Sequence, residues 1–119
     1  MILEYLISCS DEDQIVADYL SVGYNNSFSL VVYIESSNAE TGQNKYVVAA
    51  FVEKEEAYSL ARQLNMSMKE LPAMIAEEFD YDIVNASQMQ ISDAFRDIVE
   101  YLCDHRIHCK VIVSPRSLE

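Results

Sequence analysis

Hydrophobic and polar residues alternate along two stretches near the middle of the chain, a period-two pattern that is typical of β-strands. The stretches are 27–36 (SFSLVVYIES) and 45–52 (KYVVAAFV), and both are rich in β-branched and aromatic residues. A polar loop of eight residues that contains Gly42 separates them, so an antiparallel hairpin is expected. Shorter apolar stretches at 2–8 and 107–114 predict one further strand near each end of the chain.

Apolar residues at helical spacing follow the first of these strands. In the stretch 10–20 (SDEDQIVADYL), Ser10 can cap a helix, and the acidic residues at 11–13 suit the positive end of a helix dipole. The apolar positions 15, 16, 19 and 20 would then share one face. The pattern predicts a helix here that ends at Gly23.

Three more helices are expected in the second half of the chain. Residues 53–64 carry acids in the first turn and an apolar stripe after them. The next helix follows Ser67 and Glu70, which have the spacing of a capping box, and Pro72 fits its first turn. The last helix covers about 92–104. Its inward stripe consists of Phe95, Ile98, Val99, Leu102 and Cys103.

The predicted order of elements, β-α-β-β-α-α-α-β, indicates the α+β class. We expect a single two-layer domain over residues 1–117, with an antiparallel or mixed four-stranded sheet and helices mainly on one face. If the two helices after the third strand are an insertion, the remaining order is ferredoxin-like. Another α+β arrangement with a hairpin at its centre is the competing interpretation. Residues 118–119 are interpreted as the remnant of an expression tag.

The chain is strongly acidic, because 20 Asp and Glu residues against 8 Lys and Arg give a formal net charge of −12 over 119 residues. Binding to nucleic acid needs clustered Lys and Arg, and the sequence has no such cluster. Nucleic acid and anionic membrane are therefore not expected as partners. A protein partner is expected to be neutral or basic, although the same charge also serves solubility alone.

Cysteine usage and the first residues indicate the compartment. Three cysteines are an odd number, which favours free thiols in a reducing cytoplasm. The start of the chain, MILEYLISC, contains an acid and no basic residue, so we interpret it as a strand rather than a signal peptide. Apolar runs are far shorter than the roughly 20 residues of a membrane-spanning helix. A cytoplasmic protein is predicted.

Two cysteines and two histidines in the stretch 100–110 (EYLCDHRIHCK) raise the question of a zinc site. Zinc ligands must converge on one tetrahedron. Cys103 belongs to the predicted helical stripe and Cys109 to the predicted strand, and His108 points to the opposite face of that strand. His105 suits the negative end of the helix. Neither a metal site nor a Cys–His catalytic pair is therefore expected.

The sequence lacks other motifs of catalysis or cofactor binding. Gly23 and Gly42 are its only glycines, so no glycine-rich phosphate loop can be written. No serine lies in a Gly-x-Ser-x-Gly elbow. The acidic stretch 77–82 (EEFDYD) lacks the glycine of a calcium loop. No cofactor, metal or catalytic residue is predicted.

The most informative pattern is that both faces of the central hairpin are partly apolar, whereas a half-exposed antiparallel sheet should alternate more cleanly. One of these faces is expected to carry Val31, Tyr33, Tyr46 and Val48. In one interpretation the helices cover this face, and in the other it is an open contact surface. The last strand adds polar residues to this face. The candidate interaction face consists of Val31, Tyr33, Tyr46, Val48, His108 and Lys110.

These patterns favour a small acidic protein that binds another protein, or itself, through the candidate face. One specific form is an immunity-type inhibitor that masks a basic surface of its partner, with acidic helix starts steering association. The alternative is a small-ligand sensor or minor enzyme with a pocket between the sheet and the helices. His108 and Tyr33 would then be among its polar groups.

Overall fold

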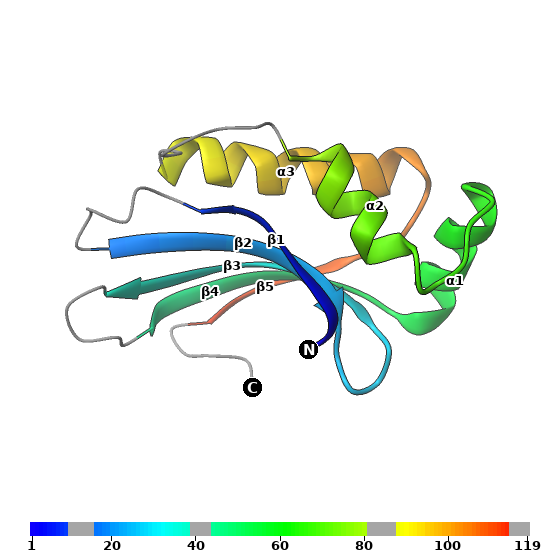
Figure 1. Cartoon of the computed structure of the whole chain (residues 1–119), viewed down its shortest axis with the longest axis horizontal. Helices are drawn as coiled ribbons and strands as arrows, with labels where there is room; N and C mark the ends of the chain where they lie inside the picture. Colours follow the sequence, from blue (N-terminus) through cyan, green and yellow to red (C-terminus); the bar gives the residue numbers. More distant parts are fainter. Residues whose placement is uncertain (10–15, 39–43, 81–87, 115–119) are drawn as a thin grey trace.

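The centre of the fold is a five-stranded antiparallel sheet whose strands lie in sequence order, β1-β2-β3-β4-β5 (Figure 1). The computed structural model describes residues 1–9, 16–38, 44–80 and 88–114. The strands are β1 (Ile2–Cys9), β2 (Val16–Tyr24), β3 (Leu30–Asn38), β4 (Asn44–Val52) and β5 (Lys110–Ser114). The helices, which lie on one side of the sheet, are α1 (Lys54–Gln63), α2 (Leu71–Glu78) and α3 (Gln88–Asp104).

The predicted α+β class is confirmed, as two layers with the helices on one face of the sheet. The sheet has five strands rather than four, and the ferredoxin-like order is not found. A ferredoxin-like sheet needs a helical crossover between its first two strands. Here β1 and β2 pair directly as antiparallel neighbours, and so do β2 with β3 and β3 with β4.

The helix predicted over 10–20 is wrong from Val16 onward, because Val16–Tyr24 forms β2. Residues 10–15 lie outside the described part of the chain. In β2, Leu20, Val22 and Tyr24 recur at every second position and are buried. The apolar positions 15, 16, 19 and 20 also fit the spacing of a helix. The strand forms because it buries Leu20, Val22 and Tyr24 against the helices.

Gly23 lies inside β2 and does not end a helix, which corrects a second expectation. A Cβ atom at this position would stand 3.0 Å from the Cα of Glu4 and 3.1 Å from the carbonyl oxygen of Ile2. The pairing of β1 with β2 is irregular here, with a register shift between Ile2 and Tyr5. The absence of a side chain at Gly23 therefore favours the close approach of β1 to β2.

The main hydrophobic core fills the space between the sheet and the helices. α2 packs mainly on β1 and β2, and α3 on β2 and β3. The sheet contributes an alternate row of residues, namely Leu20, Val22, Tyr24, Leu30, Val32, Ile34, Ala50 and Val52. On the same face the hydroxyl of Ser36 donates a hydrogen bond to the buried carboxylate of Asp18, which satisfies both polar groups within the layer.

The helices of the second half form where the sequence predicts them, with shifted bounds. Pro72 lies in the first turn of α2 as expected, and Leu71, Ile75 and Phe79 are buried in the core. The predicted capping box is only partly formed. The backbone N–H of Ser67 donates to Oε2 of Glu70 over 3.5 Å, in the turn that precedes α2.

Residues 25–29 form a turn, so β3 begins at Leu30 rather than at residue 27. The side-chain oxygen of Asn25 accepts hydrogen bonds from the backbone N–H groups of Ser27 and Ser29, each at 3.0 Å. The backbone N–H of Phe28 also donates to the carbonyl oxygen of Asn25 at 3.0 Å. A side chain that satisfies backbone donors in this way competes with extension of the strand.

The end of α3 differs from the expectation in two respects. Cys103 is exposed rather than part of the core stripe, because it lies about 100° around the helix from the fully buried Leu102. The chain then turns through Arg106, which has a positive φ of 59°. Backbone hydrogen bonds from Arg106 to Cys103 and from Ile107 to Leu102, both 2.9 Å, close this turn, so the last strand begins at Lys110 rather than at residue 107.

Candidate functional site

The sheet face opposite the helices is the surface that the described helices leave uncovered (Figure 1). Cross-strand register identifies its members, since residues directly opposite each other in an antiparallel pair share a face. We call this surface the open face. Among its residues are Tyr19, Ser21, Val31, Tyr33, Glu35, Val47, Ala49, Phe51, Lys110 and Ile112.

Two residues of the predicted interaction face do not belong to the open face. Val48 lies opposite Ile34, and Tyr46 lies opposite Ser36. Ile34 and Ser36 are buried on the side of the helices. The prediction that Tyr46 and Val48 share a surface with Val31 and Tyr33 is therefore wrong. An error of one residue in the assumed register of β4 against β3 exchanges the two faces of the strand.

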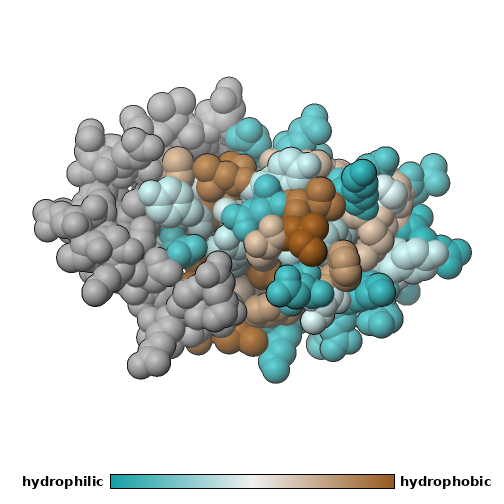
Figure 2. All heavy atoms as spheres, turned by 60° about the horizontal axis from the view of Figure 1, so that its bottom comes forward, coloured by the Kyte–Doolittle hydropathy of each residue, from teal (hydrophilic) through white to brown (hydrophobic). Residues whose placement is uncertain are grey.

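A small apolar floor occupies the middle of the open face. Val31, Val47 and Ala49 are buried there, and Tyr33 and Phe51 pack against them. Figure 2, which brings the lower side of Figure 1 forward, shows apolar side chains gathered among hydrophilic ones on this side of the molecule. The interpretation in which helices cover Val31 and Tyr33 is thus wrong, since the helices pack on the other face.

A hollow of about 510 Å³ opens over this floor, and we call it the groove. Two of its lining residues are carboxylates, and none of them is Lys or Arg. The lining comes from the start of β1, the turn after β2, and strands β3 and β4. It consists of Met1, Glu4, Asn25, Asn26, Ser27, Val31, Tyr33, Glu35, Val47 and Phe51.

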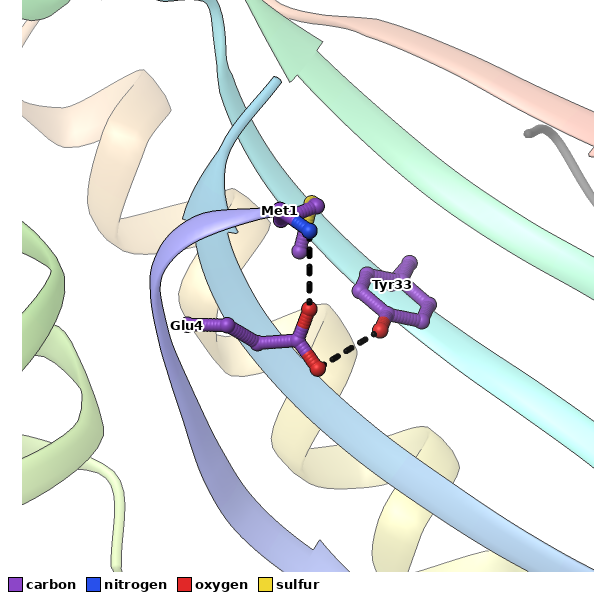
Figure 3. Close-up of polar contacts among 3 residues, drawn as sticks. All are labelled: Met1, Glu4 and Tyr33. Atoms are coloured by element: carbon purple, nitrogen blue, oxygen red, sulfur yellow. Dashed lines mark hydrogen bonds and ion pairs between the residues drawn. The ribbon is translucent and has the colours of Figure 1, made fainter. Parts of the chain in front are cut away.

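Glu4 joins the β1 side of the groove to its floor (Figure 3). Its Oε1 accepts a hydrogen bond of 3.2 Å from the hydroxyl of Tyr33, a residue 29 positions away in sequence. Its Oε2 lies 3.8 Å from the terminal ammonium of Met1. The carboxylate therefore already faces one cation and one hydroxyl donor in the groove, and it remains exposed to solvent. The close approach of β1 to Gly23 positions it there.

The surroundings raise the pKa of the Tyr33 hydroxyl from 10.0 to about 12. Burial is the main cause, and the charge of Glu4, the hydrogen bond to Glu4 and the charge of Glu35 act in the same direction. A hydrogen bond with Ser21 lowers the pKa in part. Tyr33 therefore keeps its proton at neutral pH, which suits a hydrogen-bond donor better than an acid–base catalyst.

His108 and Lys110 lie outside the groove lining. Lys110 is exposed and lies opposite Phe51, so it belongs to the open face as predicted. His108 is also exposed, but it precedes β5 instead of forming part of it. Lys110 thus places a positive charge at the β5 border of the open face.

The cysteines and histidines near the end of α3 have separate surroundings. Cys103 is exposed, Cys109 is partly buried against the core, and Nδ1 of His105 lies 2.8 Å from the carbonyl oxygen of Tyr101. Burial, followed by the influence of Cys103, raises the pKa of the Cys109 thiol and lowers its nucleophilicity. Within the described ranges, no three His, Cys, Asp or Glu side chains are grouped to hold a metal ion.

Sequence reasoning missed most of the groove. Glu35 could have been found from the alternation of β3, since it continues the row of Val31 and Tyr33. Val47 and Phe51 form one alternate row of β4, but the sequence offers two such rows and no basis for choosing between them. The approach of Glu4 to Tyr33 has no local signal at all.

Comparison of the chain with protein-family models, curated proteins and solved structures gives no match. Among the helices of the described part, none is both long enough and apolar enough to cross a membrane. Functional reasoning therefore starts from the open face and its groove.

Proposed function

We propose that the protein is an interaction module that binds a basic segment of a partner protein in the groove of the open face. The observation that supports this proposal is an apolar floor without a helix over it, bordered by the carboxylates of Glu4 and Glu35. Apolar surface left on one side of a sheet is typical of a contact site. The acidic border favours a partner that combines apolar and positively charged groups.

Lysine and arginine side chains fit this arrangement chemically. Their aliphatic stems can lie against the partly exposed rings of Tyr33 and Phe51, which pack on the buried floor, while the charged head stays beside Glu4 and Glu35. There the carboxylates offer charge-assisted hydrogen bonds, and the rings of Tyr33 and Phe51 offer faces on which a guanidinium can stack. A segment in which basic and apolar residues alternate would use both features.

The charge of the whole chain supports the same type of partner. A net charge of −12 attracts a basic surface over a distance and accelerates its association. An inhibitor that masks the basic surface of another protein is the specific form of this function that we favour.

Peptide display on the immobilised protein tests the proposal. We expect enrichment of peptides rich in Arg and Lys with apolar neighbours. The double variant Glu4→Gln/Glu35→Gln should weaken binding of an enriched peptide by roughly tenfold, since exposed charge contacts contribute about 0.2–1 kcal/mol each. Isothermal titration calorimetry measures the change.

A matched control removes the same charge far from the groove. Glu55→Gln/Glu100→Gln changes two exposed helix positions and should leave binding within about twofold. Equal weakening by both double variants would mean that only net charge attracts the peptide, and enrichment of peptides without Lys or Arg would contradict the proposal directly.

A second candidate, favoured by the size of the groove, is the binding of a small molecule. A volume of about 510 Å³ lies within the range of small-molecule sites, roughly 300–1,000 Å³. The same chemistry would select an amphipathic amine or guanidine, and the site would lie opposite the helices rather than between them and the sheet. Thermal shift with a panel of such amines, repeated on Glu4→Gln/Glu35→Gln, separates this candidate from peptide binding.

A further inference from the structure

The outer edge of β5 is a strand edge that carries exposed apolar side chains. Among the described strands, β5 pairs only with β4. Val111 and Val113 lie on the helix side of the sheet, yet they are 49% and 70% exposed, because α2 and α3 pack mainly on the strands at the other end. A free edge presents a row of backbone N–H and C=O groups with which another strand can pair.

The opposite edge of the sheet is less suited to pairing. β1 has two register shifts against β2, between Ile2 and Tyr5 and between Leu6 and Ser8. Leu3 also adopts a positive φ of 51°. Such irregularities bend a strand away from a regular edge and discourage the addition of a further strand. The ladder between β4 and β5 is regular over Lys110–Ser114.

We propose that β5 pairs in antiparallel orientation with β5 of a second copy, so that the two sheets join into one. The sequence of residues 111–113 is Val-Ile-Val, which reads the same in both directions. Pairing centred on Ile112 therefore places Val111 of each copy opposite Val113 of the other, which gives a self-complementary two-fold interface. It also keeps the helices of both copies on the same side of the joined sheet.

The charge distribution favours a second copy at this edge. After Asp104 the sequence contains Arg106, Lys110 and Arg116 and no acid before Glu119, so this end of the chain is its least acidic part. In the proposed register Lys110 of one copy lies opposite Ser114 of the other, which avoids a like-charge pair. Two copies of charge −12 still repel each other, so the dimer is expected to be weak and to need salt.

Two matched double variants test both the edge and the register. Val111→Lys/Val113→Lys places like charges opposite each other and should abolish the dimer. Val111→Glu/Val113→Lys places Glu opposite Lys of the other copy and should retain it. Both change exposed positions, so circular dichroism should show an unchanged fold. Multi-angle light scattering of the full chain at about 0.5 M NaCl, where repulsion is largely screened, measures the association.

Three results would overturn the inference. A wild-type chain that stays monomeric at millimolar concentration has no such interface. Loss of the dimer in both double variants excludes the register centred on Ile112, and its survival in both places the interface elsewhere. Met89→Lys, at a 75% exposed position of α3, serves as the control for added charge and should leave the dimer intact.

Discussion

At the scale of single residues, Tyr33 links the parts of the candidate site. Its ring packs against the apolar floor, and its hydroxyl donates to Glu4 at the rim. Burial keeps the hydroxyl protonated, because an ionised oxygen would lose its hydration there, and the charges of Glu4 and Glu35 add to this effect. The residue therefore supplies apolar surface and a hydrogen-bond donor at the same point.

The raised pKa of Tyr33 leads to a prediction about pH. Its folded value of about 12 lies above the ordinary value of 10.0, so its contribution to stability is complete below pH 10 and is lost as the pH rises through about 12. The difference in ultraviolet absorbance between wild type and Tyr33→Phe should titrate with a midpoint near 12. Glu4→Gln should lower this midpoint, since it removes one of the charges that raise the pKa. A midpoint near 10 in the wild type would contradict the buried position of the hydroxyl.

At the scale of elements, the approach of β1 to β2 forms one side of the groove. Glu4 belongs to β1 and Met1 directly precedes this strand. β1 reaches its position because Gly23 leaves room for the backbone of Ile2 and Glu4. The sequence suggested a helix and a stop at this point, and the strand that forms instead uses the glycine for close packing. β2, for which the sequence predicts a helix, is thus the strand against which β1 packs and through which Glu4 is positioned at the groove.

Gly23→Ala is expected to displace β1 and to lower the free energy of unfolding by about 1–3 kcal/mol, because the new Cβ would meet backbone atoms that cannot rotate away. Urea denaturation measures the loss. The same variant should lower the pKa of Tyr33, since Glu4 moves away from its hydroxyl. Ser29→Ala, in the turn that follows β2, is a control that should change stability by less than about 0.5 kcal/mol. Unchanged stability in Gly23→Ala would mean that β1 does not lie against β2 as described.

At the scale of the whole molecule, the helices cover one face of the sheet and leave two surfaces of different character. The open face has an apolar floor with the carboxylates of Glu4 and Glu35 in its groove, and the β5 edge is apolar and carries no acid. The fold class followed from the sequence, because hydrophobic residues recur at strand or helix spacing over 45–52, 53–64 and about 92–104, and this spacing involves only residues close together in the chain. The candidate face followed only in part: Val31, Tyr33 and Lys110 belong to it, whereas Tyr46 and Val48 do not.

The two surfaces should respond to salt in opposite directions. Raising the ionic strength shortens the screening length from roughly 10 Å at 0.1 M to roughly 3 Å at 1 M. Attraction between the acidic groove and a basic peptide should then weaken, while repulsion between two chains of charge −12 also weakens and the dimer should strengthen. Fluorescence anisotropy of a labelled peptide and light scattering of the chain, in the same buffers, measure both. If peptide binding and self-association both strengthen or both weaken with salt, either the groove does not bind basic peptides by charge or the β5 edge does not form the dimer.

The sequence by itself determined the net charge, the absence of a basic cluster and the local periods that give most helices and strands. Net charge depends on composition alone, and the other two properties depend on residues close together in the chain. Only the tertiary structure decided that Val16–Tyr24 is a strand, that Val47 rather than Val48 lies opposite Glu35, and that Glu4 meets Tyr33. Register and close approach depend on contacts between distant segments, and a shift of one residue exchanges the faces of a strand without changing its period.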